Sequence, residues 1–334
     1  KVNLLRRLLG LYEERLTDLS SASWAAAQIL KLVPGDRDAL LRLESIFERS
    51  NDRPRLVKML EYHLRYATSA EEKLGLVRRI ADLVQHQLGD FDRAIPYWDN
   101  VLKHVPGDQQ ALQALLAGYD KAGRLEDLAR TLDLQILALA ADPSAQAELL
   151  RRLARLAGEG LKETPRAQKA WQDLLKILPA DREGLEALSA LASAQSDWES
   201  LADLLALRVG IATNPADAVP LALQRASLLV EKLDDSAEAI RALEHIISDL
   251  DPASVEAHHA LRQVAEARND WPRVAIVAER QLSFASDPRE RVARALEIGC
   301  LYRDHLQDAK KAINAFERVV EIEPEQSDAL AALA

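Results

Sequence analysis

Residues 312–324, AINAFERVVEIEP, contain the pattern that decides the fold of this chain. Its spacing of Ala312, Phe316, Val319 and Pro324 recurs in weaker form throughout the sequence. The opening alanine returns every 72 or 73 residues, at Ala22, Ala94, Ala167, Ala239 and Ala312. The closing proline keeps the same period, at Pro34, Pro106, Pro179, Pro252 and Pro324. A fixed period is typical of a solenoid, in which each unit buries its apolar face only by stacking on its neighbours.

Two further signals share this period. A bulky residue stands between the alanine and the proline, at Trp98, Trp171, Leu243 and Phe316. Offset from it runs a second apolar position, each time after a polar turn, at Leu56, Leu128, Leu201 and Val274. Two signals per period indicate two helical hairpins per unit. We therefore predict about nineteen helices, with antiparallel neighbours because every connection is short.

Proline and aspartate separate the expected helices. Pro34 ends one helix because it cannot continue the hydrogen-bond ladder, and Asp36 can cap the next. The device returns at Pro106 with Asp108 and at Pro179 with Asp181. The first predicted helix covers 2–18, and the second follows the turn 18–21 and ends near residue 33. The next helices are predicted at 37–49, 53–67, 70–87, 90–103, 109–121, 125–140, 144–160, 164–177, 182–194, 198–212, 216–231, 236–249, 254–268, 271–285, 288–305 and 308–321. A last helix begins at about 326.

Composition agrees with an all-α fold. Ala, Leu, Arg and Glu dominate, and aromatic residues make up only 4%, which argues against strands. No linker or low-complexity stretch interrupts the repeat, so we interpret residues 1–334 as one solenoid domain. The sequence starts without Met and stops inside a repeat, which predicts a fragment of a longer protein. Arginine outnumbers lysine, a bias of GC-rich genomes that suggests a bacterial source.

Charge and hydropathy exclude some classes of partner. The net charge of −10 argues against nucleic acid, because phosphate binding needs a basic surface. No apolar run is long enough to span a membrane, and no secretory leader opens the sequence. The single cysteine, Cys300, is expected to be a small buried residue. A lone cysteine fits a reducing compartment, so the cytoplasm is favoured, although the localisation stays open.

Residue sets that carry catalysis are missing from the sequence. There is no glycine-rich phosphate loop, no nucleophile elbow and no His-Glu-x-x-His. His258 and His259 with Glu256 form the one crowded metal-like trio, but adjacent histidines on a helix point about 100° apart. We therefore predict no enzyme activity, no cofactor and no metal.

The last complete hairpin carries a recognisable signature. Its residues are Leu296, Gly299, Tyr302, Ala312, Phe316 and Pro324. With this spacing it resembles the tetratricopeptide repeat, whose helix-turn-helix has small residues where two helices touch and a proline at its end. The resemblance implies a right-handed superhelix whose first helices line a concave groove for a protein segment. One departure is an extra residue between Gly299 and Ala312, which lengthens the first helix or its turn.

An arginine pair recurs on the first helix of three units, at 6–7, 78–79 and 151–152, and then gives way to Leu223-Gln224 and Leu296-Glu297. By resemblance, the first member of each pair would face the groove, and so would the positions one turn on, which are Asp82, Arg155, Ser227 and Cys300. These positions lack the asparagines and lysines that clamp chaperone tails. The alternative is a solvated face with local pairs such as Arg78 to Asp82 or Glu148 to Arg152.

The candidate partner-binding residues are therefore Arg78, Asp82, Arg151 and Arg155. Arginine grips carboxylates through paired hydrogen bonds, so an acidic or C-terminal peptide segment of another protein is the expected ligand. Two alternatives stay open, a regulatory or substrate-recruiting arm of a multidomain enzyme and a purely structural spacer. The oligomeric state also stays open.

Overall fold

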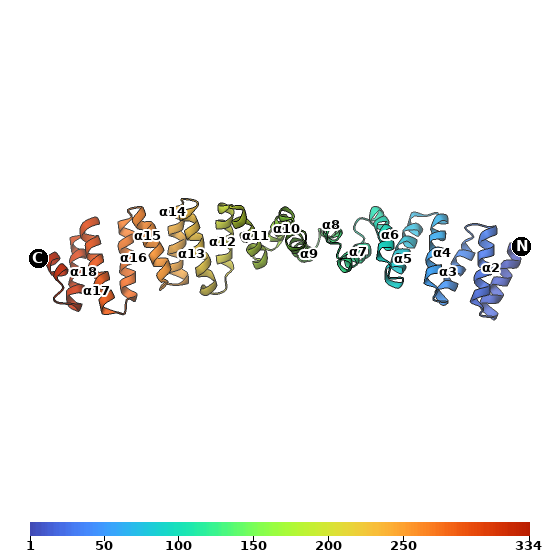
Figure 1. Ribbon diagram of the computed structural model, residues 1–334, viewed down its shortest axis with the longest axis horizontal. Helices are drawn as coiled ribbons and strands as arrows, with labels where there is room; N and C mark the ends of the chain where they lie inside the picture. The colour runs from blue at the N-terminus through green and yellow to red at the C-terminus, as the bar shows by residue number, and fades with distance from the viewer. The chain divides into compact units, whose positions relative to one another are not determined.

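The computed structural model describes all residues 1–334, and its regular elements are all helical. It contains nineteen α-helices, which confirms the predicted number and class (Figure 1). The first ten are α1 (Val2–Gly10), α2 (Leu19–Leu32), α3 (Arg37–Arg49), α4 (Arg53–Tyr66), α5 (Ala70–Asp82), α6 (Phe91–His104), α7 (Gln109–Ala122), α8 (Leu125–Ala138), α9 (Pro143–Arg155) and α10 (Thr164–Ile177). The others are α11 (Arg182–Gln195), α12 (Trp198–Ile211), α13 (Pro215–Glu231), α14 (Ser236–His245), α15 (Val255–Ala267), α16 (Trp271–Phe284), α17 (Pro288–Cys300), α18 (Ala309–Ile322) and α19 (Ser327–Leu333).

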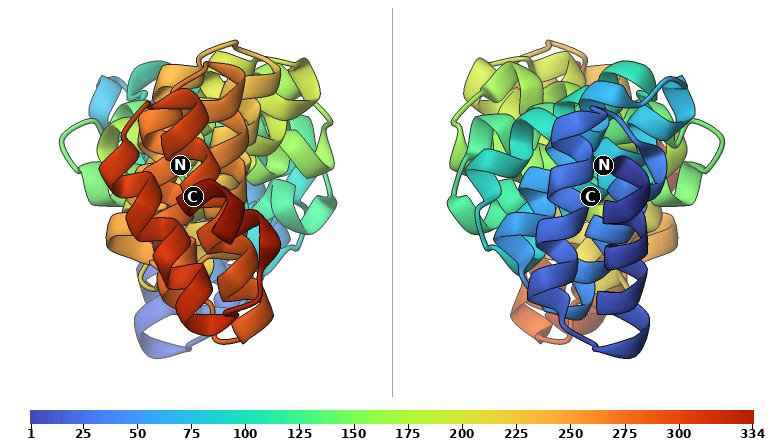
Figure 2. Two further views of the ribbon diagram at one scale, coloured as in Figure 1. Left: turned by 90° about the vertical axis from the view of Figure 1, so that its left-hand side faces the viewer. Right: turned by 90° about the vertical axis from the view of Figure 1, so that its right-hand side faces the viewer.

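The helices form two compact units, Lys1–Ala170 and Trp171–Ala334. Within each unit, consecutive helices pack against each other as antiparallel hairpins, and odd-numbered helices are the first of each hairpin. Figure 2 shows the terminal hairpins closely, with α17 and α18 in front in its left panel and α1 and α2 in its right panel. The prediction of one domain over residues 1–334 stays a prediction.

Aspartates at the N-caps explain where many helices begin. Asp36 accepts from the backbone N–H of Ala39 at 3.0 Å, and Asp108 accepts from that of Ala111 at 2.8 Å. A helix start has four N–H groups without a backbone partner, and the cap satisfies one of them. Asp18 caps in the same way, so α2 begins at Leu19, inside the predicted turn 18–21 and three residues before the predicted start of that helix.

The periodic residues form the core, as predicted. The five alanines from Ala22 to Ala312 are exposed by 4% or less, and Trp98 and Trp171 are buried. Two glycines give the closest helix contacts. A Cβ on Gly118 would lie 1.9 Å from Cε2 of Phe91, and one on Gly299 would lie 2.4 Å from Cε1 of Phe316. The contacts of α7 with α6 and of α17 with α18 therefore require a residue without a side chain.

Several predicted helices end in a π-helical turn, which the sequence signalled only through the extra residue before Ala312. Four such turns follow first helices, and a fifth follows α14. They are η1 (Leu11–Arg15), η2 (Leu83–Gln87), η3 (Leu156–Gly160), η4 (Ile246–Leu250) and η5 (Leu301–His305). In the last hairpin, Leu306 donates to the carbonyl of Leu301, five residues back, at 3.2 Å. A π turn holds one residue more than an α turn, so η5 accommodates the extra residue of this repeat.

The predicted helix 2–18 is too long by three residues. Helical backbone ends at Arg15, and Thr17 adopts a positive φ of 48°. Apart from this end and the start of α2, the predicted boundaries lie within two residues of the observed ones when the π turns are counted with their helices.

Candidate functional site

The first-helix side of the last hairpins contains a hollow of about 430 Å³. Leu296, Cys300 and Arg303 line it from α17 and η5, opposite Asp328 of α19. In the repeat, Leu296 and Cys300 occupy the positions of Arg78 and Asp82. The repeat positions that we predicted to face a groove therefore line a hollow in this hairpin. Cys300 is half-buried here, less enclosed than expected.

A second hollow, of about 470 Å³, lies between the first helices α11 and α13 and beside the end of α12. Glu186 forms ion pairs with two arginines that line this hollow, with Arg182 Nε at 3.0 Å and Arg208 Nη2 at 3.7 Å. Asp217 from α13 adds a further carboxylate, and Pro220 supplies apolar surface. Charges of both signs thus meet in a partly apolar cleft between consecutive first helices.

In the N-terminal unit, arginines of first helices reach the cap of the next first helix. Arg78 donates from Nε to Oδ2 of Asp108 at 3.0 Å, and Arg6 donates to Asp36 at 2.5 Å. The side chains of Asp36 and Asp108 are only 8% and 9% exposed. The pKa of Asp36 lies below its ordinary value because the N–H of Ala39 donates to it, and Arg6 adds to this effect.

Two of the second arginines, Arg79 and Arg152, have partners on other first helices. Arg79 lies 3.0 Å from the buried Glu44, which also contacts His63 Nδ1 at 2.5 Å. Arg152 lies 3.2 Å from Asp120 of α7. These contacts join adjacent hairpins of the unit.

The local pairs that we proposed for the solvated-face alternative are wrong in their partners. Arg78 bonds Asp108 on the following hairpin, while Asp82 lies 3.1 Å from Nδ1 of His86. Glu148 accepts from Arg151 at 2.7 Å, three residues on. The sequence could not show this, because the partner of Arg78 depends on how α5 and α7 stack.

The four candidate residues fall on two first helices. Arg78 and Asp82 lie one turn apart on α5, and Arg151 and Arg155 lie one turn apart on α9. The Arg151 side chain is 18% exposed, and Arg155 is exposed. Both make polar interactions within the chain. Their role in binding a partner stays a prediction.

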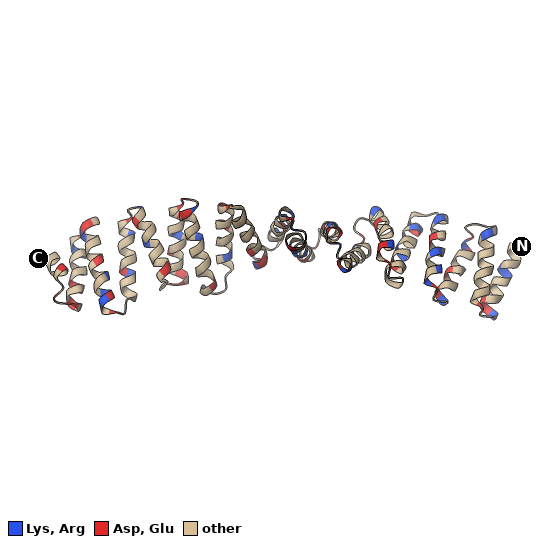
Figure 3. Ribbon diagram, in the orientation of Figure 1, with Lys and Arg blue, Asp and Glu red and all other residues tan.

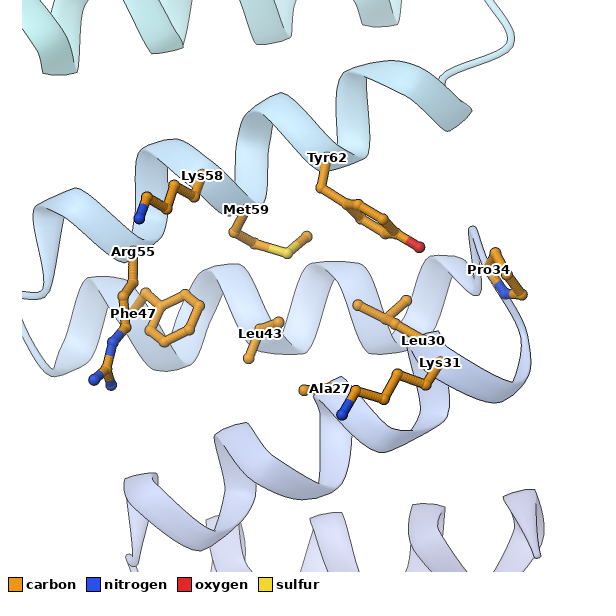
Figure 4. A pocket seen from close by; sticks show the side chains of 10 residues that line it. All are labelled: Ala27, Leu30, Lys31, Pro34, Leu43, Phe47, Arg55, Lys58, Met59 and Tyr62. Carbon is orange, nitrogen blue, oxygen red and sulfur yellow. The ribbon is translucent and has the colours of Figure 1, made fainter.

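A third hollow lies on the second-helix side and was missed by the sequence analysis. It has a volume of about 490 Å³ and lies between α2 and α4, above α3 (Figure 4). Its apolar residues Leu30, Leu43 and Met59 have the spacing of ordinary core positions, so nothing in the sequence distinguishes them. Its charged residues are all cations, although acidic and basic residues occur together in both units (Figure 3).

Of the metal-like trio, His258 lies inside the fold, while Glu256 and His259 are exposed. His258 is 2% exposed, and its Nδ1 lies 2.7 Å from the carbonyl oxygen of Ser254. No cluster of three His, Cys, Asp or Glu residues in the chain could hold a metal ion.

None of the helices combines the length and the apolar character needed to cross a membrane.

Comparison with known proteins identifies one repeat. The tetratricopeptide repeat family model matches residues 295–326, which run from α17 to the turn before α19. This match confirms the resemblance of the last hairpin. A search of curated proteins found no match.

Solved structures with similar helices include a chain of the Naa15/Naa10 complex bound to HypK-THB, 18% identical, with a TM-score of 0.34 over 99% of this chain. This chain spans 59% of that one. A tetratricopeptide repeat protein from Parabacteroides merdae is 14% identical, with a TM-score of 0.31 over 80% of this chain and 98% of its own. The C-terminal part of a repeat protein from Cytophaga hutchinsonii is 12% identical, with a TM-score of 0.30 over 100% of both chains.

Proposed function

We propose that this tetratricopeptide-like solenoid is a protein-interaction scaffold that holds a segment of another protein on its first-helix side. Tetratricopeptide repeats generally bind proteins, and residues 295–326 match that family. The observation that carries the proposal is the position of two hollows in the C-terminal unit. Both lie between consecutive first helices, one between α11 and α13 and one between α17 and α19. A segment bound there would contact successive repeats at equivalent positions.

The arginines on α9, in the N-terminal unit, indicate the chemistry of a segment that would bind the first-helix side of that unit. Arg151 pairs with Glu148, whose side chain is 76% exposed. Ion pairs with an exposed member contribute little stability, so a ligand carboxylate could replace Glu148 at small cost while the other interaction of Arg151 within the chain is kept. Arg155 stands one turn away on the same helix. We therefore assign an acidic or C-terminal peptide segment to Arg151 and Arg155, whereas Asp82, itself an anion, would contact only a cation or a hydrogen-bond donor of a bound segment.

Arg78 has a different part in this proposal. Its partner Asp108 is nearly buried and also caps α7. If Arg78 turned away from Asp108 to bind a ligand, a desolvated carboxylate would be left without its cation, and the free energy of unfolding would fall. Arg78 therefore positions the first helices and does not itself bind the segment.

Site-specific photo-cross-linking tests the proposal. A photoreactive amino acid is placed at Glu148 on α9 in one variant and at Ser227 on α13 in another, and the matched controls carry it at Lys169 on α10 and at Ala237 on α14, all exposed positions. Illumination in a lysate of the source organism, followed by mass spectrometry, should identify partner segments attached at the two first-helix positions, with the segment attached at Glu148 rich in Asp and Glu. The proposal is wrong if the attached segments are the same at a first-helix position and at its control, or if attachment occurs only at the controls.

A further inference from the structure

The hollow in the N-terminal unit is an apolar groove with defined walls. α2 forms one wall with Ala27 and Leu30, α4 forms the other with Met59 and Tyr62, and α3 lies between them (Figure 4). The groove runs from Pro34 at one end to the region of Phe47 and Arg55 at the other. We name these lining residues, with Lys31, Leu43 and Lys58, the α2–α4 groove.

The floor of the α2–α4 groove is built to accept apolar side chains. Leu30, Leu43 and Met59 retain only 5% to 7% exposure, while Phe47 and Tyr62 are partly buried at its sides. Methionine and aromatic side chains adapt to differently shaped apolar partners. An apolar ligand group placed there would contact all three helices.

The rim of the groove is positive. Lys31 stands on α2, and Arg55 and Lys58 stand on α4, while no carboxylate lines the groove. Arg55 lies 3.3 Å from Asp52, whereas Lys31 and Lys58 have no ion-pair partner within the chain. The whole chain carries a net charge of −10, so this local excess of cations is contrary to the overall charge. A negatively charged ligand would relieve the repulsion across the groove.

The backbone of the walls limits the conformation of the ligand. All three lining segments are helical, so their N–H and C=O groups are largely used in their own hydrogen bonds. An extended peptide would find few backbone partners in this groove. A helix satisfies its own backbone groups and can pack as a further helix beside α2 and α4.

We propose that the α2–α4 groove binds an amphipathic helix of a partner protein, with apolar side chains at helical spacing and acidic side chains on both flanks. The apolar face would pack on Leu30, Leu43 and Met59, and the acidic flanks would pair with Lys31 and Lys58. The site lies on second helices, so this proposal does not depend on the first-helix site described above.

The test uses a displayed library of helical peptides with a randomised surface, selected against the whole chain. Selected peptides should combine Leu, Ile or Phe at helical spacing with flanking Asp and Glu. Fluorescence anisotropy then measures their affinity for the double variant Lys31→Glu with Lys58→Glu, which should bind roughly tenfold more weakly or worse. The matched control is Lys73→Glu with Lys121→Glu, which changes net charge equally at exposed positions of the same unit and should bind as the parent does.

A second variant separates the apolar from the charged contribution. Ala27→Trp fills the groove from α2 and should abolish binding of the selected peptides while circular dichroism stays helical. The proposal is overturned if selection yields basic or uncharged peptides, or if the lysine variant and its control bind equally. Binding retained by Ala27→Trp, or a self-associating chain that excludes the peptides, overturns it as well. The double variant Arg151→Glu with Arg155→Glu should bind the selected peptides normally, so the two proposed sites can fail separately.

Discussion

Arg78 on α5 and Asp108 at the N-cap of α7 are joined by a hydrogen bond of 3.0 Å from Nε to Oδ2. Asp108 also accepts from the N–H of Ala111, so one carboxylate both starts α7 and fastens α5 to it. Arg6 and Asp36 repeat this relationship one unit earlier. The arginine thus stabilises the stacking of consecutive first helices.

In the C-terminal unit, both partners change together. Leu223 and Leu296 stand at the arginine positions, and the caps of α15 and α19 are Ser254 and Gln326. A nearly buried aspartate needs a cation beside it, whereas serine and glutamine are neutral and cap without one. This joint replacement within one sequence supports a structural role for Arg6 and Arg78.

The Arg78–Asp108 contact predicts a graded loss of stability. Arg78→Ala should lower the free energy of unfolding by about 1–2 kcal/mol, because it removes a charge-assisted bond to a nearly buried carboxylate. Asp108→Ala should cost more than Asp108→Asn, since asparagine still caps α7. Urea unfolding monitored by circular dichroism measures all three. The control Arg65→Ala changes an exposed residue without an ion pair and should stay within about 0.5 kcal/mol of the parent. Equal midpoints for Arg78→Ala and Arg65→Ala would contradict the role assigned to the contact.

Two glycines on first helices should respond in opposite directions to the same change. Gly118→Ala should destabilise the protein by about 1–3 kcal/mol, because its Cβ would meet the ring of Phe91 at 1.9 Å. Gly75→Ala has nothing within 4 Å of the new Cβ and should stabilise α5 by about 0.5–1 kcal/mol. Thermal melts of the two variants measure both effects. A Gly118→Ala variant that melts at or above the temperature of the parent would show that the Phe91 contact is not limiting.

The periodic alanine of the third unit gives a test of the register. Ala167 is 2% exposed, so its methyl group lies in packed surroundings that a much larger side chain would overpack. Ala167→Trp should destabilise by about 1–3 kcal/mol or more. Arg182→Ala removes a residue whose side chain is 75% exposed and should change stability little. The register would be wrong if the two variants melted at the same temperature.

Much of the fold could be predicted because residues that recur at the repeat period are the ones that are buried. A residue that returns every 72 or 73 positions, such as Ala94 or Trp98, marks the same packing environment each time, and both are fully buried. The π turns could not be predicted in this way. A turn such as η2 adds one residue without disturbing the apolar stripe, since Leu83 and Val84 are both buried. Only the extra residue before Ala312 signalled such a turn.

The sites were harder to predict because they depend on contacts between helices distant in sequence. Arg78 and Asp108 were each part of a visible pattern, but their separation of 30 residues has meaning only once α5 and α7 are stacked. The α2–α4 groove was hidden for a related reason. Leu43 and Met59 look like core residues, and the space between their helices depends on side-chain packing.

Tyr97 predicts a change of stability at high pH. Burial, together with the hydrogen bond that its hydroxyl donates to Glu61 at 2.7 Å, raises its pKa from 10.0 to about 12. The fold therefore favours the neutral phenol. Its stabilising contribution is complete below pH 10.0 and is lost as the pH rises through about 12.

Tyr97→Phe removes this titration. The parent should lose more stability than the variant over the alkaline range, as measured by urea unfolding at a series of pH values. Phenolate absorbance should show one fewer late-titrating tyrosine in the variant, with Tyr302, whose pKa burial also raises, present in both proteins. Identical phenolate titrations, apart from the loss of one early-titrating group, would refute the prediction.

The last prediction concerns the candidate site on α9. Arg151 and Arg155 lie one turn apart, so both can reach one acidic segment, and their mutual repulsion favours a bound carboxylate. Arg151→Glu with Arg155→Glu should therefore abolish binding of the cross-linked partner segment, prepared as a synthetic peptide, in isothermal titration calorimetry. The matched control is Arg241→Glu with Arg268→Glu, on α14 and at the end of α15, which changes the net charge equally.

Folding must be separated from binding in this experiment. Arg151 bonds Glu148 at 2.7 Å, and Arg155 also has a partner within the chain, so reversal can perturb α9. The milder variant Arg151→Gln with Arg155→Gln removes charge without adding repulsion and should weaken binding by roughly tenfold while the melting temperature stays close to that of the parent. Unchanged affinity in this variant, with the parent and control also binding, would assign the arginines of α9 to stability alone and place the segment elsewhere on the first-helix side.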